Sequence, residues 1–77
     1  MEETRELTVG EKAVGLNFNP SNDPQVQEIK VVCANLIDMV DKSCDLNNPV
    51  NRKIRDCAIQ ELITAQMWAV KAITWKY

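Results

Sequence analysis

Trp68, Lys71 and Trp75 place one cation between two indole rings near the carboxyl end of the chain. Residues three and four positions apart lie on the same side of a helix, so both rings can flank the ammonium group. Such a cation can hold a phosphate while a nucleobase stacks on an indole. Alternatively, the lysine stem extends past packed neighbours and leaves its ammonium in water. The spacing leaves both interpretations open.

A second set of candidate binding residues precedes a predicted helix that begins at Pro24. Phe18 stands among amide and hydroxyl side chains, including Asn19 and Ser21. A helix N-terminus favours anions, so this corner could stack a base and hold a phosphate, with Lys30 further along the helix. In the alternative, Phe18 packs on apolar helix residues as a hydrophobic staple. The residues alone favour the staple.

A basic cluster, Arg52, Lys53 and Arg55, could suggest a surface for nucleic acid. The net charge of −2 argues against this, because polymer binding depends on neutralising many phosphates. Three acids end the preceding predicted helix: Asp38, Asp41 and Asp45. In an antiparallel hairpin the basic cluster would lie beside these acids, and pairing accounts for both groups. We therefore expect no binding to nucleic-acid polymers.

The sequence lacks the parts of the usual catalytic devices. It has no histidine, no Gly-x-Ser-x-Gly motif and no phosphate-binding loop. Cys33, Cys44 and Cys57 are odd in number and widely spaced, which fits neither a disulfide framework nor a zinc site. We expect reduced, mostly packed thiols in a cytosolic protein. We also expect no enzyme activity, no cofactor and no metal.

The elements that must position these residues are helices. Asp23 and Pro24 predict a helix start, and the pair Asn48 and Pro49 repeats the device. The spacing predicts one helix to about Ser43 and, after a short turn, another to about Trp75. Residues 1–15 predict a short helix with acids in its first turn or a partly ordered arm, and Gly10 disfavours one continuous helix there. We divide the chain into an arm and connector, residues 1–22, and a single hairpin domain, residues 23–77.

The apolar residues of the second long helix point in every direction around its axis between residues 62 and 75. We expect one side of this helix to pack against the first long helix. The residues predicted for that side are Val50, Ile54, Cys57, Ala58, Glu61 or Leu62, Ala65, Trp68 or Ala69, Ala72 and Ile73. The first long helix presents Val26, Ile29, Cys33, Leu36, Ile37, Val40 and Cys44. One partner helix cannot cover the whole circumference, so we expect a homo-oligomer. The predicted fold class is all-α, an antiparallel helical hairpin that assembles through its apolar faces.

Two stretches in combination resemble a known family. The first is the connector VGLNFNPS at residues 14–21, which leads into a helix with Ile29 and Lys30. The second is TAQMWAVKA at residues 64–72. Together they resemble the phage anti-CBASS sponge proteins, small helical hairpins related to a hairpin domain of phage anti-Thoeris sponges. The resemblance covers about residues 14–75.

This resemblance implies a function that the spacing arguments do not supply. Sponges of this kind sequester cyclic oligonucleotide messengers of bacterial immunity without cleaving them. They form hexamers, arranged as trimers of dimers. Cyclic dinucleotides of the 3′,3′-cyclic GMP-AMP type bind in pockets between protomers, and cyclic trinucleotides bind at separate sites on the threefold axis.

Carried over by position, the dinucleotide pocket would be formed by Phe18, Asn19, Pro20, Ser21 and Lys30. Phe18 would stack on a base, where some relatives have tyrosine, and Lys30 would cover a base or meet a phosphate. Lys71 would meet phosphates at the trinucleotide site, with Ala65 and Trp68 nearby. Some relatives have arginine at that position, and lysine lacks the bidentate fork of arginine.

The reduced cysteines and the lack of a membrane-spanning run or a signal peptide pattern predict a cytosolic protein, and the resemblance implies that it acts in the host bacterial cytoplasm. Sequestration would lower the free concentration of a messenger that activates a cell-killing effector. The alternative is a structural helical assembly module or adaptor that binds no ligand.

Overall fold

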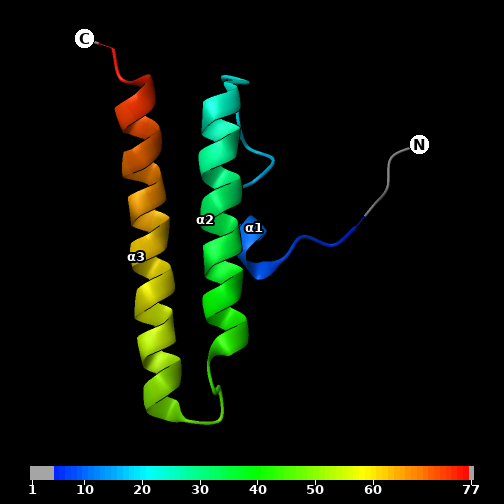
Figure 1. Ribbon diagram of the computed structural model, residues 1–77, viewed down its shortest axis with the longest axis vertical. Helices are drawn as coiled ribbons and strands as arrows, with labels where there is room; N and C mark the ends of the chain where they lie inside the picture. Colours follow the sequence, from blue (N-terminus) through cyan, green and yellow to red (C-terminus); the bar gives the residue numbers. More distant parts are fainter. Residues whose placement is uncertain (1–4, 77) are drawn as a thin grey trace.

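The computed structural model describes residues 5–76, and within that range the chain forms three helices and no strand (Figure 1). Helix α1 spans Val9–Val14, α2 spans Pro24–Ser43 and α3 spans Pro49–Thr74. Helices α2 and α3 lie side by side as an antiparallel hairpin, and α1 packs mainly against α2. The predicted all-α hairpin is therefore confirmed.

Both long helices begin at the predicted residues for the predicted reason. The Asp23 carboxylate accepts a hydrogen bond from the backbone N–H of Gln25 at 2.8 Å, and Pro24 occupies the first helical position. The Asn48 side chain likewise accepts from Val50 N–H at 3.0 Å, with Pro49 following it. The helix ends, Ser43 and Thr74, lie within one residue of the prediction.

The short N-terminal helix α1 is held by its cap and by a close approach to α2. The Thr8 hydroxyl and the Glu11 carboxylate form a reciprocal capping box. Gly10 is buried in the first turn, where a Cβ atom would overlap the backbone carbonyl of Ala34, and its N–H donates to Asp38 at 2.7 Å. Only glycine fits this contact. The acids expected in the first turn of an N-terminal helix are Glu2, Glu3 and Glu6. Glu2 and Glu3 lie outside the described residues, and Glu6 precedes α1.

The core joins all three helices. Val14 from α1 packs with Ala34 and Ile37 from α2, and all three are buried. Partly buried apolar side chains surround them: Ala13, Leu16, Cys33, Ile59, Leu62 and Ile63. Burial of Cys33 raises the pKa of its thiol.

The predicted hairpin face of the second helix is wrong over much of its length. Ile59, Ile63 and Gln66 face α2, whereas Val50 (65% exposed), Ile54 and Cys57 face solvent. Apolar residues surround the whole helix, so the pattern did not single out one face. The stripe of the first helix is correct at Val26 and Ile37, which are buried, but Leu36 is exposed. The expected packing of the thiols is likewise wrong for Cys57.

At the turn end of the hairpin, fewer of the charged residues form ion pairs than predicted. Arg55 forms ion pairs with Asp41 across the hairpin and with its neighbour Asp56. Asp38 instead accepts the N–H of Gly10, and Asp45 accepts the N–H of Asn47 in the turn. Each carboxylate satisfies a nearby backbone donor, which removes it from the predicted pairing with the basic cluster.

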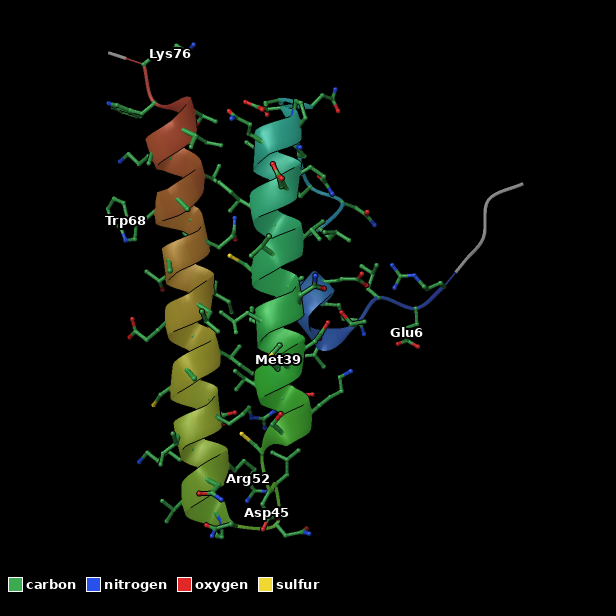
Figure 2. All side chains as sticks on the ribbon, in the orientation of Figure 1. Glu6, Met39, Asp45, Arg52, Trp68 and Lys76 are labelled. Carbon is green, nitrogen blue, oxygen red and sulfur yellow. The ribbon has the colours of Figure 1, made fainter. Side chains whose placement is uncertain are left out.

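The described chain is a single layer of helices, only 13 Å across its shortest dimension. Large apolar side chains are consequently exposed on both long helices, and Figure 2 shows Trp68 on the side of α3 opposite α2. The exposed set on these helices is Val31, Val32, Leu36, Met39, Val50, Ile54, Met67, Trp68 and Ile73. None of the helices within residues 5–76 is both long and apolar enough to cross a bilayer.

Candidate functional site

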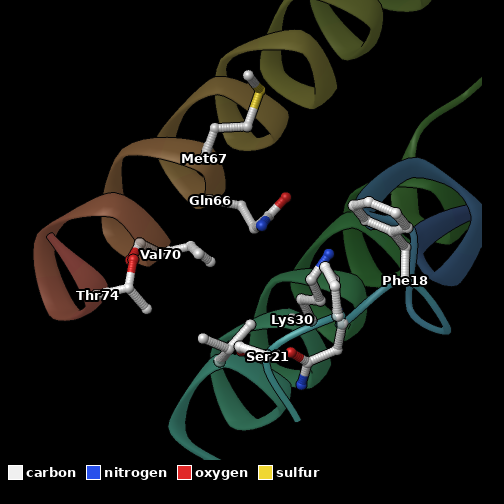
Figure 3. A pocket seen from close by; sticks show the side chains of 10 residues that line it. Phe18, Ser21, Lys30, Gln66, Met67, Val70 and Thr74 are labelled. Atoms are coloured by element: carbon white, nitrogen blue, oxygen red, sulfur yellow. Dashed lines mark hydrogen bonds between the residues drawn. The ribbon is translucent and has the colours of Figure 1, made fainter. Parts of the chain in front are cut away.

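A cavity of about 350 Å³ lies between the connector, α2 and α3 (Figure 3). The connector supplies one wall, the start of α2 the floor, and the C-terminal half of α3 the other wall. Its lining residues are Phe18, Asn19, Pro20, Ser21, Val26, Lys30, Gln66, Met67, Val70 and Thr74. All five residues predicted for a dinucleotide pocket therefore lie around one cavity.

Lys30 lines the cavity and also binds the end of α1. Its side chain is only 6% exposed, and its ammonium donates hydrogen bonds to the carbonyl oxygens of Val14 (2.8 Å) and Gly15 (3.1 Å). Burial lowers the pKa of Lys30 because the charged form loses hydration. An ammonium has three N–H donors, so two hold the end of α1 and one remains for a ligand. No pattern in the sequence indicated this contact between Lys30 and the end of α1.

Phe18 is 71% exposed, so the staple interpretation favoured by the sequence is wrong. The backbone turns at Gly15, which adopts the left-handed conformation (φ 65°), and the Phe18 N–H donates to the Gly15 carbonyl at 2.8 Å. This tight turn directs the ring toward Lys30, whose ammonium lies 5.8 Å from the ring centroid. An exposed aromatic face beside a buried cation is suited to a stacked, negatively charged ligand.

The other connector residues are bonded to one another. The Asn19 amide donates to the Asp23 carbonyl and to the Gln27 side chain, both at 3.2 Å. The Ser21 hydroxyl donates to Asn19 at 2.9 Å and accepts from the Asp23 N–H. These bonds keep the connector in one shape, which reduces the ordering cost of binding a ligand.

A second hollow of about 330 Å³ lies on the outer side of α3, lined by Thr64, Met67, Trp68 and Lys71. The Lys71 ammonium is 5.3 Å from the Trp68 ring centroid and 4.7 Å from that of Trp75. The predicted cation between two indoles is thus present and open to solvent. Ala65 is exposed on the same helix but does not line this hollow.

Four α3 residues of the first cavity were missed by the sequence analysis: Gln66, Met67, Val70 and Thr74. A signal for them existed in the hairpin geometry. Equal steps from the turn along both helices reach Lys30 and Gln66 together, and then Val26 and Val70. Antiparallel pairing therefore brings this face of α3 opposite the start of α2.

Neither cavity is lined by a histidine, cysteine, aspartate or glutamate. Across residues 5–76, no group of three or more such side chains is placed to hold a metal ion. The chemistry offered by both cavities is instead stacking, cation contact and hydrogen bonding.

Comparison with protein families gives one result that covers most of the chain. The Acb2/Tad1 hairpin domain matches residues 11–74. This range includes the connector, α2 and α3, which form the walls of the first cavity. Neither the curated proteins nor the solved structures yield a match to this chain.

Proposed function

The chain belongs to the Acb2/Tad1 hairpin domain family of cyclic nucleotide sponges, and we propose that it sequesters cyclic dinucleotide and trinucleotide messengers of host CBASS defence. In this proposal a phage protein acts in the host bacterial cytoplasm. It binds the messenger that would activate a cell-killing effector and releases it unchanged. No bond is made or broken.

The observation that carries this proposal is the exposed Phe18 ring beside the buried Lys30 ammonium, in a cavity of about 350 Å³. A nucleobase would stack on the ring, and the free N–H of Lys30 would donate to a phosphate or to a base. Asn19, Pro20 and Ser21 would form the fixed wall of the pocket. A preformed site supports the high affinity that a sponge requires.

For cyclic trinucleotides we propose the outer hollow of α3. The ammonium of Lys71 would meet phosphates, and the exposed face of Trp68 would contact the ligand, with Ala65 at its margin. One copy of the chain offers only a shallow surface here. Further copies of α3 around a threefold axis would multiply the cations and enclose the ligand.

The exposed surface supports self-association. Large apolar side chains are exposed on the faces of α2 and α3 that lie outside the hairpin contact, among them Met39, Ile54 and Trp68. Exposed apolar patches on a small domain commonly mark a surface that binds another protein. We propose that these faces assemble the chain into a hexamer, as a trimer of dimers.

Calorimetry with a panel of cyclic dinucleotides and cyclic trinucleotides tests this function. We expect saturable heats with 3′,3′-cyclic GMP-AMP and with at least one cyclic trinucleotide. A Kd of about 1 nM would correspond to roughly −12 kcal/mol, within reach of a preformed pocket. A panel without heat would refute the proposal and favour the alternative of a structural adaptor.

A further inference from the structure

We propose that Gln66 reads the base edge of a purine, with adenine as its best match, inside the cavity of Phe18 and Lys30. This inference rests on the proposed function, because it assigns a specificity residue to the same pocket. It depends on the placement of one buried amide on α3 opposite the aromatic ring and the cation.

Gln66 is the only uncharged polar residue among those classed as buried in residues 5–76, at 5% exposure. Its α3 neighbours along the same face are apolar, namely Ile63 and Val70. Within residues 5–76 the Gln66 amide forms no hydrogen bond to another side chain or to the backbone, yet its polar atoms are not sealed in the interior. They open onto the cavity, where a ligand can bond to them.

The direction of the side chain indicates what could satisfy it. Figure 3 shows the Gln66 amide leaving α3 and pointing across the cavity toward Phe18 and Lys30. A base stacked on the Phe18 ring would present its edge to the remaining walls of the cavity. The α3 wall has two hydrogen-bonding side chains, Gln66 and Thr74. The Thr74 hydroxyl already donates to the Val70 carbonyl, so Gln66 is the one that remains for a ligand.

The chemistry of the amide selects the partner. A glutamine offers one acceptor oxygen and one donor NH2 group side by side. Adenine presents an adjacent donor and acceptor on its Hoogsteen edge, N6–H and N7, and again on its Watson–Crick edge, N6–H and N1. Glutamine pairs with such an edge through two hydrogen bonds. Guanine presents such a pair only on its Watson–Crick edge, O6 and N1–H, because its Hoogsteen edge has two acceptors, which suit a cation better than an amide.

Changing the amide to a carboxylate gives a test that separates base reading from packing. Gln66→Glu has the same shape but only acceptors, which oppose the acceptor nitrogen of adenine and match the two donors on the Watson–Crick edge of guanine. Affinities for cyclic di-AMP and cyclic di-GMP are measured by calorimetry for wild type, Gln66→Glu and Gln66→Met. Gln60→Met, an exposed glutamine on the same helix, is the matched control.

We expect Gln66→Glu to shift the ratio of the two Kd values by about tenfold or more toward cyclic di-GMP. Gln66→Met keeps the side-chain volume and should weaken cyclic di-AMP binding about tenfold while preserving cyclic trinucleotide binding on the outer side of α3. Gln60→Met should match wild type with every ligand.

Unchanged cyclic di-AMP affinity in both Gln66 variants would overturn the assignment of Gln66 and leave the sponge function intact. Equal losses for cyclic di-AMP, cyclic di-GMP and trinucleotides would also overturn it, since they would mark a structural residue. Wild-type protein that binds no cyclic dinucleotide would overturn the sponge function itself, and the assignment with it.

Discussion

At the scale of single residues, the Phe18 ring is exposed, and the Lys30 ammonium lies 5.8 Å from its centroid. Replacing it by alanine in Phe18→Ala should leave the fold unchanged but remove base stacking, which is worth about 1–3 kcal/mol. We expect cyclic dinucleotide affinity to fall about 5- to 150-fold by calorimetry, with cyclic trinucleotides unaffected. Phe18→Tyr keeps the ring and should bind nearly as wild type.

Lys71 offers the complementary change on the other side of α3. Lys71→Ala removes a charged donor from the outer hollow, where a hydrogen bond from a charged group is worth about 1.5–3 kcal/mol. Trinucleotide affinity should fall roughly 10- to 150-fold, and dinucleotide affinity should stay the same. Lys53→Ala, an exposed lysine near the start of the same helix, controls for net charge. Equal loss of both ligands in well-folded Lys71→Ala or Phe18→Ala would refute two separate sites.

At the scale of elements, the cap of α1 depends on an ionised carboxylate. Glu11 accepts hydrogen bonds from Arg5 at 2.7 and 3.0 Å and from the Thr8 N–H at 2.9 Å, and these lower its pKa to about 2. A pKa lowered by folding stabilises the folded chain above the unfolded value, near 4.5, and this contribution disappears as the pH falls toward 2.

The stability of α1 should therefore decrease between pH 4.5 and pH 2. Amide hydrogen exchange in Val9–Val14 measures this directly. In Glu11→Gln, exchange at pH 5 should already be faster than in wild type, and the difference should shrink toward pH 2. Glu6→Gln removes an exposed carboxylate that forms a longer contact with Lys12 and serves as control. A difference between Glu11→Gln and wild type that does not change with pH would contradict this role.

The helices themselves were predictable, because their starts depend on local chemistry. Asp23 with Pro24, and Asn48 with Pro49, specify a cap and a first-turn proline within a few residues of sequence. The orientation of α3 was not predictable from its own residues. Its apolar side chains cover every side, and only the contact with α2 selects Ile59, Ile63 and Gln66 as the inner face.

The same contrast holds for the candidate site. The connector residues are adjacent in sequence, so Phe18, Asn19 and Ser21 were expected together and do lie together. The exposure of the Phe18 ring depends on the turn at Gly15. The burial of Lys30 depends on the packing of α1 against α2, which places the Val14 carbonyl within hydrogen-bond distance of the Lys30 ammonium. These are tertiary effects, which periodicity and propensity do not report.

At the scale of the whole molecule, the exposed apolar faces of α2 and α3 should bring copies of the chain together. Sedimentation velocity at micromolar concentration should show wild type well above the monomer mass of 8.8 kDa. Ile54→Glu replaces an exposed apolar side chain of α3 by a charged one. Association through this face would remove water from the charge at a cost in free energy, so the variant should shift toward smaller species. Gln25→Glu adds a charge at an exposed polar position of α2 and should sediment as wild type.

A well-folded wild-type protein of 8.8 kDa at this concentration would contradict the proposed assembly. It would also leave the outer hollow of α3 as a shallow surface on one helix. The walls of the cavity of Phe18 and Lys30 come from one chain, and in the proposed hexamer a second protomer would cover its open side. The outer hollow has only one helix as its wall, so it depends on assembly more strongly.

Equilibrium dialysis with 3′,3′-cyclic GMP-AMP tests sequestration most directly. With binding sites in excess, we predict that the free nucleotide falls to a small fraction of the total. Heating to denature the protein should then return all of it, with its mass and both phosphodiester bonds unchanged by mass spectrometry. A free concentration that never falls, or a nucleotide that returns cleaved, would contradict a sponge that holds its ligand intact.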